Sequence, residues 1–144
     1  MPLYLPLISS IITAFFNCFP VTIRRAEFGD SPDGLVGEKG CVEVKSVIPS
    51  THWERIEKGG YDTAYKWQIQ GHLLISNREW CDFISYCPEF VEDKQLYIFK
   101  VYRDNDMIEM LEARLYEFSK VVKSKIEYLI NPPPPSLVGG GYLK

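Results

Sequence analysis

Apolar residues recur at helical spacing through the C-terminal third of the chain. Intervals of three and four positions place seven of them on one face of a helix that begins near Asn105. Asn131 and the four prolines after it end this helix. We expect the helix to lie across a sheet. Its apolar face consists of Ile108, Leu111, Leu115, Phe118, Val122, Ile126 and Leu129.

Segments upstream of this helix are rich in β-branched and aromatic residues, or alternate in polarity, which predicts strands. They are residues 21–28, the stretch around Glu43, residues 80–86 and residues 95–102. Alternate residues of a strand face the same way, so Glu43 and Lys45 share one surface. Val42 and Val44 then point to the opposite, buried face. Together the strands predict a mixed sheet.

A short helix is predicted between two of these strands. Residues 51–54, Thr-His-Trp-Glu, have the pattern of a capping box that opens a helix, and Gly59-Gly60 ends it. This segment can flank a cleft at the edge of the sheet. We expect His52 to be a surface residue rather than a catalytic base.

A second helix is predicted over residues 62–76. Tyr65, Gln68 and His72 recur on one of its sides at intervals of three and four. This side can face the carboxylates of the neighbouring strand. Periodicity alone would still leave Gln68 as an ordinary surface residue.

The composition is that of a folded protein. A chain of 144 residues, 46% hydrophobic and 14% aromatic, fits one globular domain with a real core. We assign residues 21–131 to this domain and residues 132–144 to a flexible tail rich in Pro and Gly. Residues 1–20 are apolar, but they contain no Lys or Arg and Pro6 interrupts them. We therefore expect a packed helix there rather than a signal peptide or membrane span.

The net charge and the cysteines argue against general electrostatic binding of nucleic acid and against a zinc site. The net charge of -3 gives no general attraction to nucleic acid, so any DNA contact must come from a local basic surface and a metal ion. The four cysteines lack Cys-x-x-Cys spacing, and with only two histidines they do not predict a zinc site. We expect reduced, buried thiols in a cytosolic protein. The cysteines are Cys18, Cys41, Cys81 and Cys87.

Candidate chemistry gathers between Asp33 and Lys45. Asp33 lies in a Pro-Asp-Gly turn, and Gly37 and Gly40 let the chain fold back so that its carboxylate approaches that of Glu43. Two converging carboxylates form a hard oxygen site for Mg²⁺ or Mn²⁺. Lys45 beside the ion can hold or deprotonate a water and offset the charge on a phosphoryl group. On spacing alone, a surface hairpin with an ordinary Glu-x-Lys pair fits equally well.

Several motifs follow this turn in a defined order. Ser-Pro-Asp-Gly is followed by Glu-Val-Lys, whose acid and lysine lie ten and twelve residues beyond Asp33. Later motifs are Gly59-Gly60, Tyr65, Trp67-Gln68-Ile69-Gln70-Gly71 and Arg78-Glu79-Trp80-Cys81-Asp82-Phe83. From about Phe28 to Tyr102 the chain resembles the phage lambda exonuclease and YqaJ-like viral recombinase family. The resemblance implies the fold of PD-(D/E)xK nucleases, a restriction-endonuclease-like α/β core with a central mixed sheet flanked by helices.

The same resemblance implies a role for individual residues. Asp33 and Glu43 would bind Mg²⁺, with Mn²⁺ as the other candidate, and the backbone carbonyl of Val44 would add a ligand. Lys45 would be the catalytic lysine and Gln68 a supporting catalytic residue. The implied activity is a metal-dependent DNA exonuclease that digests double-stranded ends from 5′ to 3′ in phage-type recombination. Implied partners are an annealing protein for single strands and further copies of the chain, in the cytoplasm of a bacterium that hosts a phage or prophage.

Two alternatives remain open. The metal site alone does not distinguish end-directed from internal cleavage, so a restriction-like or repair endonuclease is the first. The second is an N-terminally shortened relative that binds DNA but cleaves it weakly. Members of the family carry N-terminal helices with a further acidic residue and with basic residues for the DNA end, and no acid precedes Val21 here. Glu27 is the acid upstream of Asp33 that we consider as its replacement.

Overall fold

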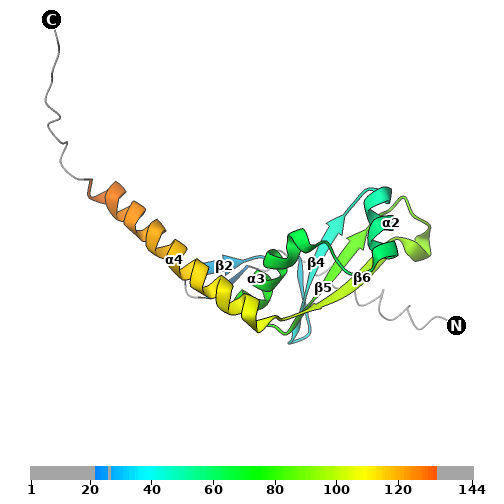
Figure 1. Ribbon diagram of the computed structural model, residues 1–144, viewed down its shortest axis with the longest axis horizontal. Helices are drawn as coiled ribbons and strands as arrows, with labels where there is room; N and C mark the ends of the chain where they lie inside the picture. The colour runs from blue at the N-terminus through cyan, green and yellow to red at the C-terminus, as the bar shows by residue number, and fades with distance from the viewer. Residues whose placement is uncertain (1–21, 26, 133–144) are drawn as a thin grey trace, which may run out of the picture. The chain divides into compact units, whose positions relative to one another are not determined.

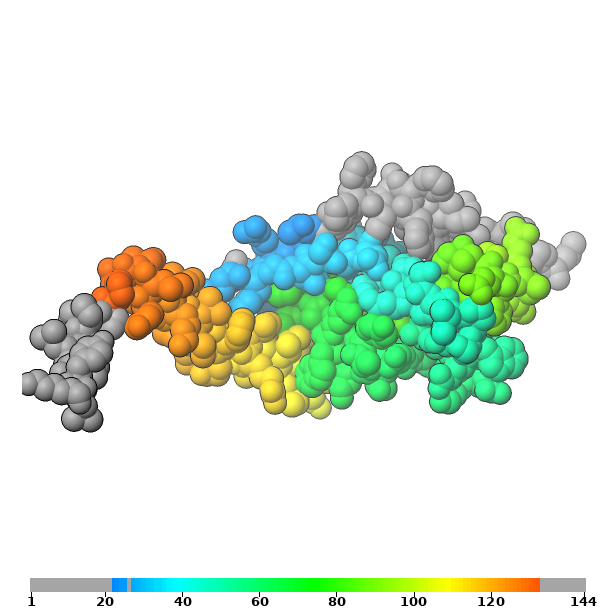
Figure 2. Space-filling view, turned by 90° about the horizontal axis from the view of Figure 1, so that it is seen from above, coloured from blue at the N-terminus to red at the C-terminus, as the bar shows by residue number. Residues whose placement is uncertain are grey.

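The computed structural model of the chain describes residues 22–25 and 27–132. Figure 1 shows how helices and strands are connected in this part of the chain, and Figure 2 shows one face of its surface. The helix predicted within residues 1–20 lies outside the described residues, as does nearly all of the predicted tail. In chain order the elements are β1 (Ile23–Arg25), β2 (Phe28–Asp30), β3 (Gly34–Val36), β4 (Gly40–Ser46), α2 (Pro49–Lys58), η1 (Thr63–Tyr65), α3 (Lys66–Ser76), β5 (Trp80–Tyr86), η2 (Glu92–Lys94), β6 (Leu96–Tyr102) and α4 (Asn105–Ile130).

Four of the strands form one sheet in the order β3-β4-β5-β6. Strands β4 and β5 are parallel and the other two pairs are antiparallel, so the sheet is mixed, as predicted. A parallel pair needs a crossover connection, which α2, η1 and α3 supply between β4 and β5. The strands predicted at residues 80–86 and 95–102 are confirmed as β5 and β6.

One face of this sheet packs against α3 and carries the core. Because β4, β5 and β6 are paired in register, their odd-numbered residues share this face. Glu43 and Lys45 lie on it, toward the end of β4, and share a surface as predicted. That surface is covered, since only 3% of Glu43 is exposed, and Val42 on the opposite face is buried as predicted, at 7%. The buried core consists of Cys41, Ile69, Leu73, Cys81, Phe83 and Val101.

The segment predicted as one strand over residues 21–28 is instead part of a hairpin. Strands β1 and β2 pair antiparallel with Ile23 opposite Asp30, so the chain reverses between Arg25 and Phe28. The prediction was wrong because β-branched and aromatic content reports strand propensity and not the place where a strand reverses. Helix α3 contacts both strands of this hairpin as well as β4 and β5. It therefore links the hairpin to the four-stranded sheet.

The capping box predicted at residues 51–54 is also wrong. Helix α2 begins earlier, at Pro49, and its N-cap Ile48 makes no side-chain cap hydrogen bond. Proline favours the first helical position because it lacks an N–H and has a preset φ, which explains the earlier start. The predicted end is confirmed, since Gly59 is the C-cap with a φ of 68°.

Helix α4 confirms the helix predicted to begin near Asn105. The chain divides into two compact units, the first ending at Ile108 and the second beginning at Glu109. Ile108 is buried within the first unit. The position of this helix across the sheet stays a prediction. Every helix within residues 22–132, residue 26 apart, is too short or too polar to cross a lipid bilayer.

Candidate functional site

The carboxylate of Glu43 is the centre of a buried polar cluster between β4 and α3. Its Oε1 accepts hydrogen bonds from Lys45 Nζ and, at 2.7 Å, from Gln68 Nε2. Its Oε2 lies 3.1 Å from His72 Nε2. Both oxygens of a side chain that is 3% exposed are therefore bound by donors. Gln68 and His72 share one face of α3, as their spacing predicted.

The charges in this cluster are set by its contacts. Burial alone would raise the pKa of Glu43, but hydrogen bonds from His72 and Lys45 outweigh it and lower the pKa. Burial alone would likewise lower the pKa of His72, but its bonds to Asp30 and Glu43 raise it to about 9. At neutral pH the cluster thus holds an ionised carboxylate between an imidazolium and an ammonium group.

His72 connects this carboxylate to a second one, at the end of β2. His72 Nδ1 lies 2.7 Å from Asp30 Oδ2, and 3% of the histidine side chain is exposed. A charged imidazole donates from both nitrogens, so His72 bridges Asp30 and Glu43. The hairpin of β1 and β2 places Asp30 here, 42 residues from its partner. Helical spacing placed His72 on the side of the helix that can face the carboxylates but gave it no role, and Asp30 was missed.

Asp33 reaches the same strand from the turn before β3. Its Oδ2 accepts a hydrogen bond of 2.7 Å from the backbone N–H of Val44. Strand β3 pairs with β4 only as far as Val42, so this N–H lies on an edge that β3 leaves open. The N–H and C=O of one residue point to the same side of a strand. The carbonyl of Val44 therefore faces the edge on which Asp33 lies.

Lys45 is held by more than its ion pair with Glu43. Its ammonium lies 4.6 Å from the ring centroid of Tyr65, which in turn packs against Phe83. The lysine side chain is 22% exposed, compared with 3% for its carboxylate partner. Lys45 and Asp30, whose side chain is 18% exposed, are therefore the charged groups of this cluster that retain access to solvent.

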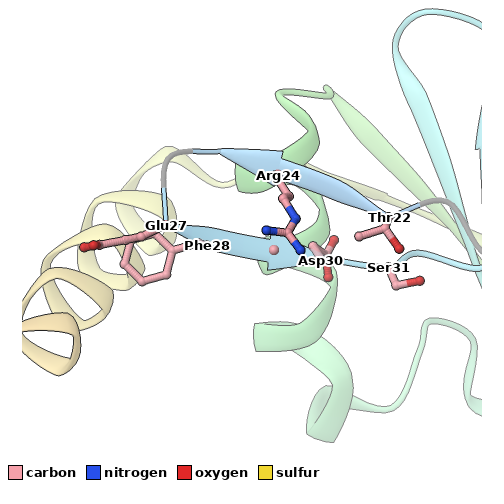
Figure 3. Close-up of a pocket in the computed structure, with 7 residues that line it drawn as sticks. Thr22, Arg24, Glu27, Phe28, Asp30 and Ser31 are labelled. Carbon is pink, nitrogen blue, oxygen red and sulfur yellow. The ribbon is translucent and has the colours of Figure 1, made fainter. Parts of the chain in front are cut away.

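A hollow of about 570 Å³ opens beside Asp30. Figure 3 shows that it is formed by both strands of the hairpin and by Ser31 after β2. Glu27 lies in the turn of the hairpin and lines this hollow, whereas Asp30 is the acid bonded into the cluster. The upstream acid associated with the site is thus Asp30 and not Glu27. The lining residues are Thr22, Arg24, Glu27, Phe28, Gly29, Asp30 and Ser31.

Asp33, Glu43 and the carbonyl of Val44 offer oxygen donors, the ligands that Mg²⁺ and Mn²⁺ take in proteins. In the described part of the chain, no three side chains of His, Cys, Asp or Glu are grouped so that they could hold a metal ion as they stand. A Mg²⁺ site, however, often takes one or two carboxylates and completes its shell with water and substrate phosphate. The donor set is of the kind that such an ion takes, and Lys45 and Gln68 occupy Oε1 of Glu43 in this structure.

The three described cysteines are free and buried, as predicted. They are Cys41, Cys81 and Cys87, and Cys18 lies outside the described residues. Cys41 and Cys81 are register partners of β4 and β5 beneath α3. Both cysteines lie on the same face of the sheet as Glu43 and Lys45. They form the apolar end of that face, and Glu43 and Lys45 form its charged end.

Comparison with solved structures finds this fold in exonucleases. The alkaline exonuclease LHK-Exo from Laribacter hongkongensis is 30% identical, with a TM-score of 0.69 over 85% of this chain and 68% of that protein. The structure of LHK-Exo in complex with dAMP shows 31% identity and a TM-score of 0.71, over 85% of this chain and 67% of that protein. A phage-related exonuclease from Haemophilus somnus 129PT is 12% identical with a TM-score of 0.57, over 76% and 60%, and supports the fold alone.

No protein-family model matches the chain, and no curated protein matches its sequence. The four-stranded mixed sheet flanked by helices is the restriction-endonuclease-like fold, as predicted. The identity to LHK-Exo extends over more than two thirds of that protein. The chain therefore belongs to the family of alkaline exonucleases that includes LHK-Exo.

Proposed function

We propose that the chain is a Mg²⁺-dependent DNA exonuclease that digests double-stranded DNA from its ends, 5′ to 3′. The observation that carries the proposal is the buried Glu43, whose Oε1 binds Lys45 and Gln68, while Asp33 binds the backbone N–H of the next residue, Val44, at the open edge of β4. Two carboxylates and a lysine at the same end of one strand are the groups that metal-assisted phosphodiester hydrolysis needs. Membership of an exonuclease family supports the same activity.

Each residue has a defined part in this proposal. Asp33, Glu43 and the Val44 carbonyl hold the ion, which when bound activates water and offsets charge on the phosphoryl group. Lys45 releases Oε1 of Glu43 and directs its ammonium to the attacking water and the scissile phosphate. Gln68 keeps its hydrogen bond to Glu43 and fixes the orientation of the carboxylate.

The imidazolium of His72 and the carboxylate of Asp30 complete the charge balance around Glu43. His72 neutralises part of the negative charge that Asp33 and Glu43 bring together while the ammonium of Lys45 is engaged with substrate. Asp30 keeps that imidazole charged and oriented. We assign both as positioning residues.

The proposed products are nucleoside monophosphates, because LHK-Exo has been crystallised with dAMP. The proposed setting is phage-type recombination in the cytoplasm of a bacterial host, with an annealing protein for single strands as partner and a homo-oligomer as the assembly. The net charge of -3 means that DNA is held by local basic groups rather than by the field of the whole chain.

Digestion of end-labelled linear duplex, compared with covalently closed circular duplex, tests the activity. In Mg²⁺ the wild-type chain is expected to degrade linear DNA and to leave circles intact, and EDTA is expected to stop it. Lys45→Met should abolish digestion, whereas Lys39→Met, which removes an exposed lysine paired with Glu79, should not. Equal cleavage of circles would favour an endonuclease. Binding of DNA without Lys45-dependent cleavage would contradict the enzyme and favour a binding relative.

A further inference from the structure

Arg55 of α2 is a buried cation without an acidic partner in the part of the chain that the structure describes. It is 8% exposed, and the side chain makes one hydrogen bond, of 3.2 Å, to Ser85 Oγ. Within the described residues no carboxylate forms an ion pair with it. A buried charge is normally paired or bound to a ligand, because removing it from water is otherwise costly. Arg55 therefore needs an explanation that the carboxylate cluster does not provide.

A buried network fixes the position of this guanidinium. His52, predicted to be a surface residue, is 0% exposed because its two ring nitrogens bond to Lys94 O and Ser85 Oγ, each at 2.9 Å. The carbonyl can only accept, so Nε2 carries the proton and Nδ1 accepts from the Ser85 hydroxyl. The serine oxygen is then free to accept from Arg55. The chain of bonds thus ends on the arginine and orients it.

An aromatic ring and a cavity complete its surroundings. The guanidinium carbon lies 5.2 Å from the ring centroid of Phe83, a distance typical of a cation–π contact. No fully buried side-chain nitrogen of the described residues lacks a partner, so the remaining guanidinium N–H groups keep contact with solvent. Arg55 is also one of the residues that line a cavity of about 320 Å³. Its lining consists of Thr51, Glu54, Arg55, Lys58, Gly59, Gly60, Tyr61, Asp62 and Thr63.

The acids that line this cavity are already engaged. Glu54 pairs with Lys58 at 2.5 Å, and Asp62 accepts a hydrogen bond of 2.9 Å from the N–H of Ala64. Two basic and two acidic side chains thus line the cavity, but only Arg55 is both buried and without a carboxylate. Arginine presents a planar fork of donors that matches phosphate oxygens. The lining residue that is left to bind a ligand is therefore Arg55, and the ligand that it would bind is an anion.

Arg55 is held close to the proposed nuclease site. Ser85, which holds Arg55, is the register partner of Lys45 across the parallel pair of β4 and β5. Both side chains point to the face covered by helices, on strands about 5 Å apart. A DNA strand with its scissile phosphate at Lys45 would bring a neighbouring phosphate toward α2.

We propose that Arg55 and its cavity bind a backbone phosphate of the DNA strand adjacent to the phosphate that is hydrolysed. This inference rests on the proposed nuclease function and assigns to it a residue and a cavity for the substrate backbone. Ser85 and His52 act as positioning residues, because they contact Arg55 or each other and not the phosphate.

Fluorescence anisotropy of a labelled duplex in EDTA tests this site without cleavage. Arg55→Met is expected to weaken binding about tenfold to a hundredfold, the range for hydrogen bonds to a charged group. The slope of log K against log salt should fall by about 0.9, the value for one lost phosphate contact. Lys39→Met removes the same charge from an exposed ion pair and is expected to change neither quantity.

Two comparisons separate loss of a phosphate contact from a purely structural effect and from loss of contact with the strand end. Ser85→Ala keeps the charge of Arg55, so affinity should fall several-fold with the salt slope unchanged. Arg55→Met should lose the same affinity for a duplex with 5′-phosphate ends as for one with 5′-hydroxyl ends. Equal losses would show that Arg55 binds a phosphate within the strand and not the one at its end. If Arg55→Met does not fold, Arg55→Lys carries the test, with weaker binding expected from the lost fork of donors.

Binding of duplex DNA by Arg55→Met with the affinity and salt slope of the wild type would overturn the phosphate site and leave the nuclease proposal standing. The same holds for Arg55→Lys where that variant replaces Arg55→Met. A loss confined to duplexes with a 5′-phosphate would also overturn it, since the bound group would then be the strand terminus. A wild-type chain without measurable affinity for duplex DNA would overturn both proposals together.

Discussion

Replacing His72 by glutamine should remove a pH-dependent part of the stability of the fold. The imidazolium bridges Asp30 and Glu43 at 2.7 and 3.1 Å, and its pKa is raised from 6.5 to about 9. A group with a raised pKa in the folded state contributes stability that is fully present below pH 6.5. That contribution is lost as the pH rises through about 9. His72→Gln keeps one possible donor for Glu43 but no charge.

The size of the effect follows from the same pKa. A rise from 6.5 to about 9, at about 1.4 kcal/mol per pH unit, corresponds to roughly 3 kcal/mol. The 3% exposure of the His72 side chain means that solvent screens little of this energy. The variant should therefore be about 3 kcal/mol less stable than the wild type near pH 6. The difference should shrink as the pH approaches 9.5.

Urea denaturation in EDTA, at intervals from pH 6 to pH 9.5, measures this difference. EDTA keeps metal binding at Glu43 from contributing. We expect the free energy of unfolding of the wild type to fall with pH relative to that of His72→Gln, so that the two curves converge. Parallel curves, or a variant that is as stable as the wild type near pH 6, would refute the bridging imidazolium.

Two further predictions concern Asp30 and the packing of the sheet. Asp30→Asn removes the carboxylate that contributes most to raising the pKa of His72, so an NMR titration of this imidazole should give a pKa below 9. An unchanged value would contradict the bridge. Gly40→Ala would place a Cβ 2.2 Å from the ring of Trp80, so we expect a loss of about 1–3 kcal/mol in urea denaturation. Gly29→Ala is the control, because its nearest contact is an ordinary 3.7 Å, and an equal loss there would remove the packing explanation.

The pattern of the sequence was sufficient to place the residues that share a face. Alternation put Glu43 and Lys45 on one side of β4, and helical spacing put Gln68 and His72 on one side of α3. The structure joins these two faces through hydrogen bonds to Glu43. Alternation does not reveal which face a helix will cover, and so it did not indicate that the glutamate is buried.

Contacts that depend on distant segments could not be read from spacing. Asp30 meets His72 only because a hairpin reverses the chain before Asp30 and α3 packs against that hairpin. His52 looked like a polar surface residue on a short helix, but Ser85 and the carbonyl of Lys94 satisfy both of its nitrogens. A polar residue becomes buried when the fold supplies its partners, and these partners lie 33 and 42 residues away.

Calorimetric titration with Mg²⁺ tests the central claim most directly, namely that Asp33 and Glu43 hold a catalytic metal ion. The wild-type chain should bind Mg²⁺, and Asp33→Asn and Glu43→Gln should each bind it much more weakly while keeping the folded circular dichroism spectrum. Each variant removes one anionic ligand and preserves its size and some of its hydrogen bonds. Unchanged Mg²⁺ affinity in both variants would contradict the metal site and with it the proposed mechanism.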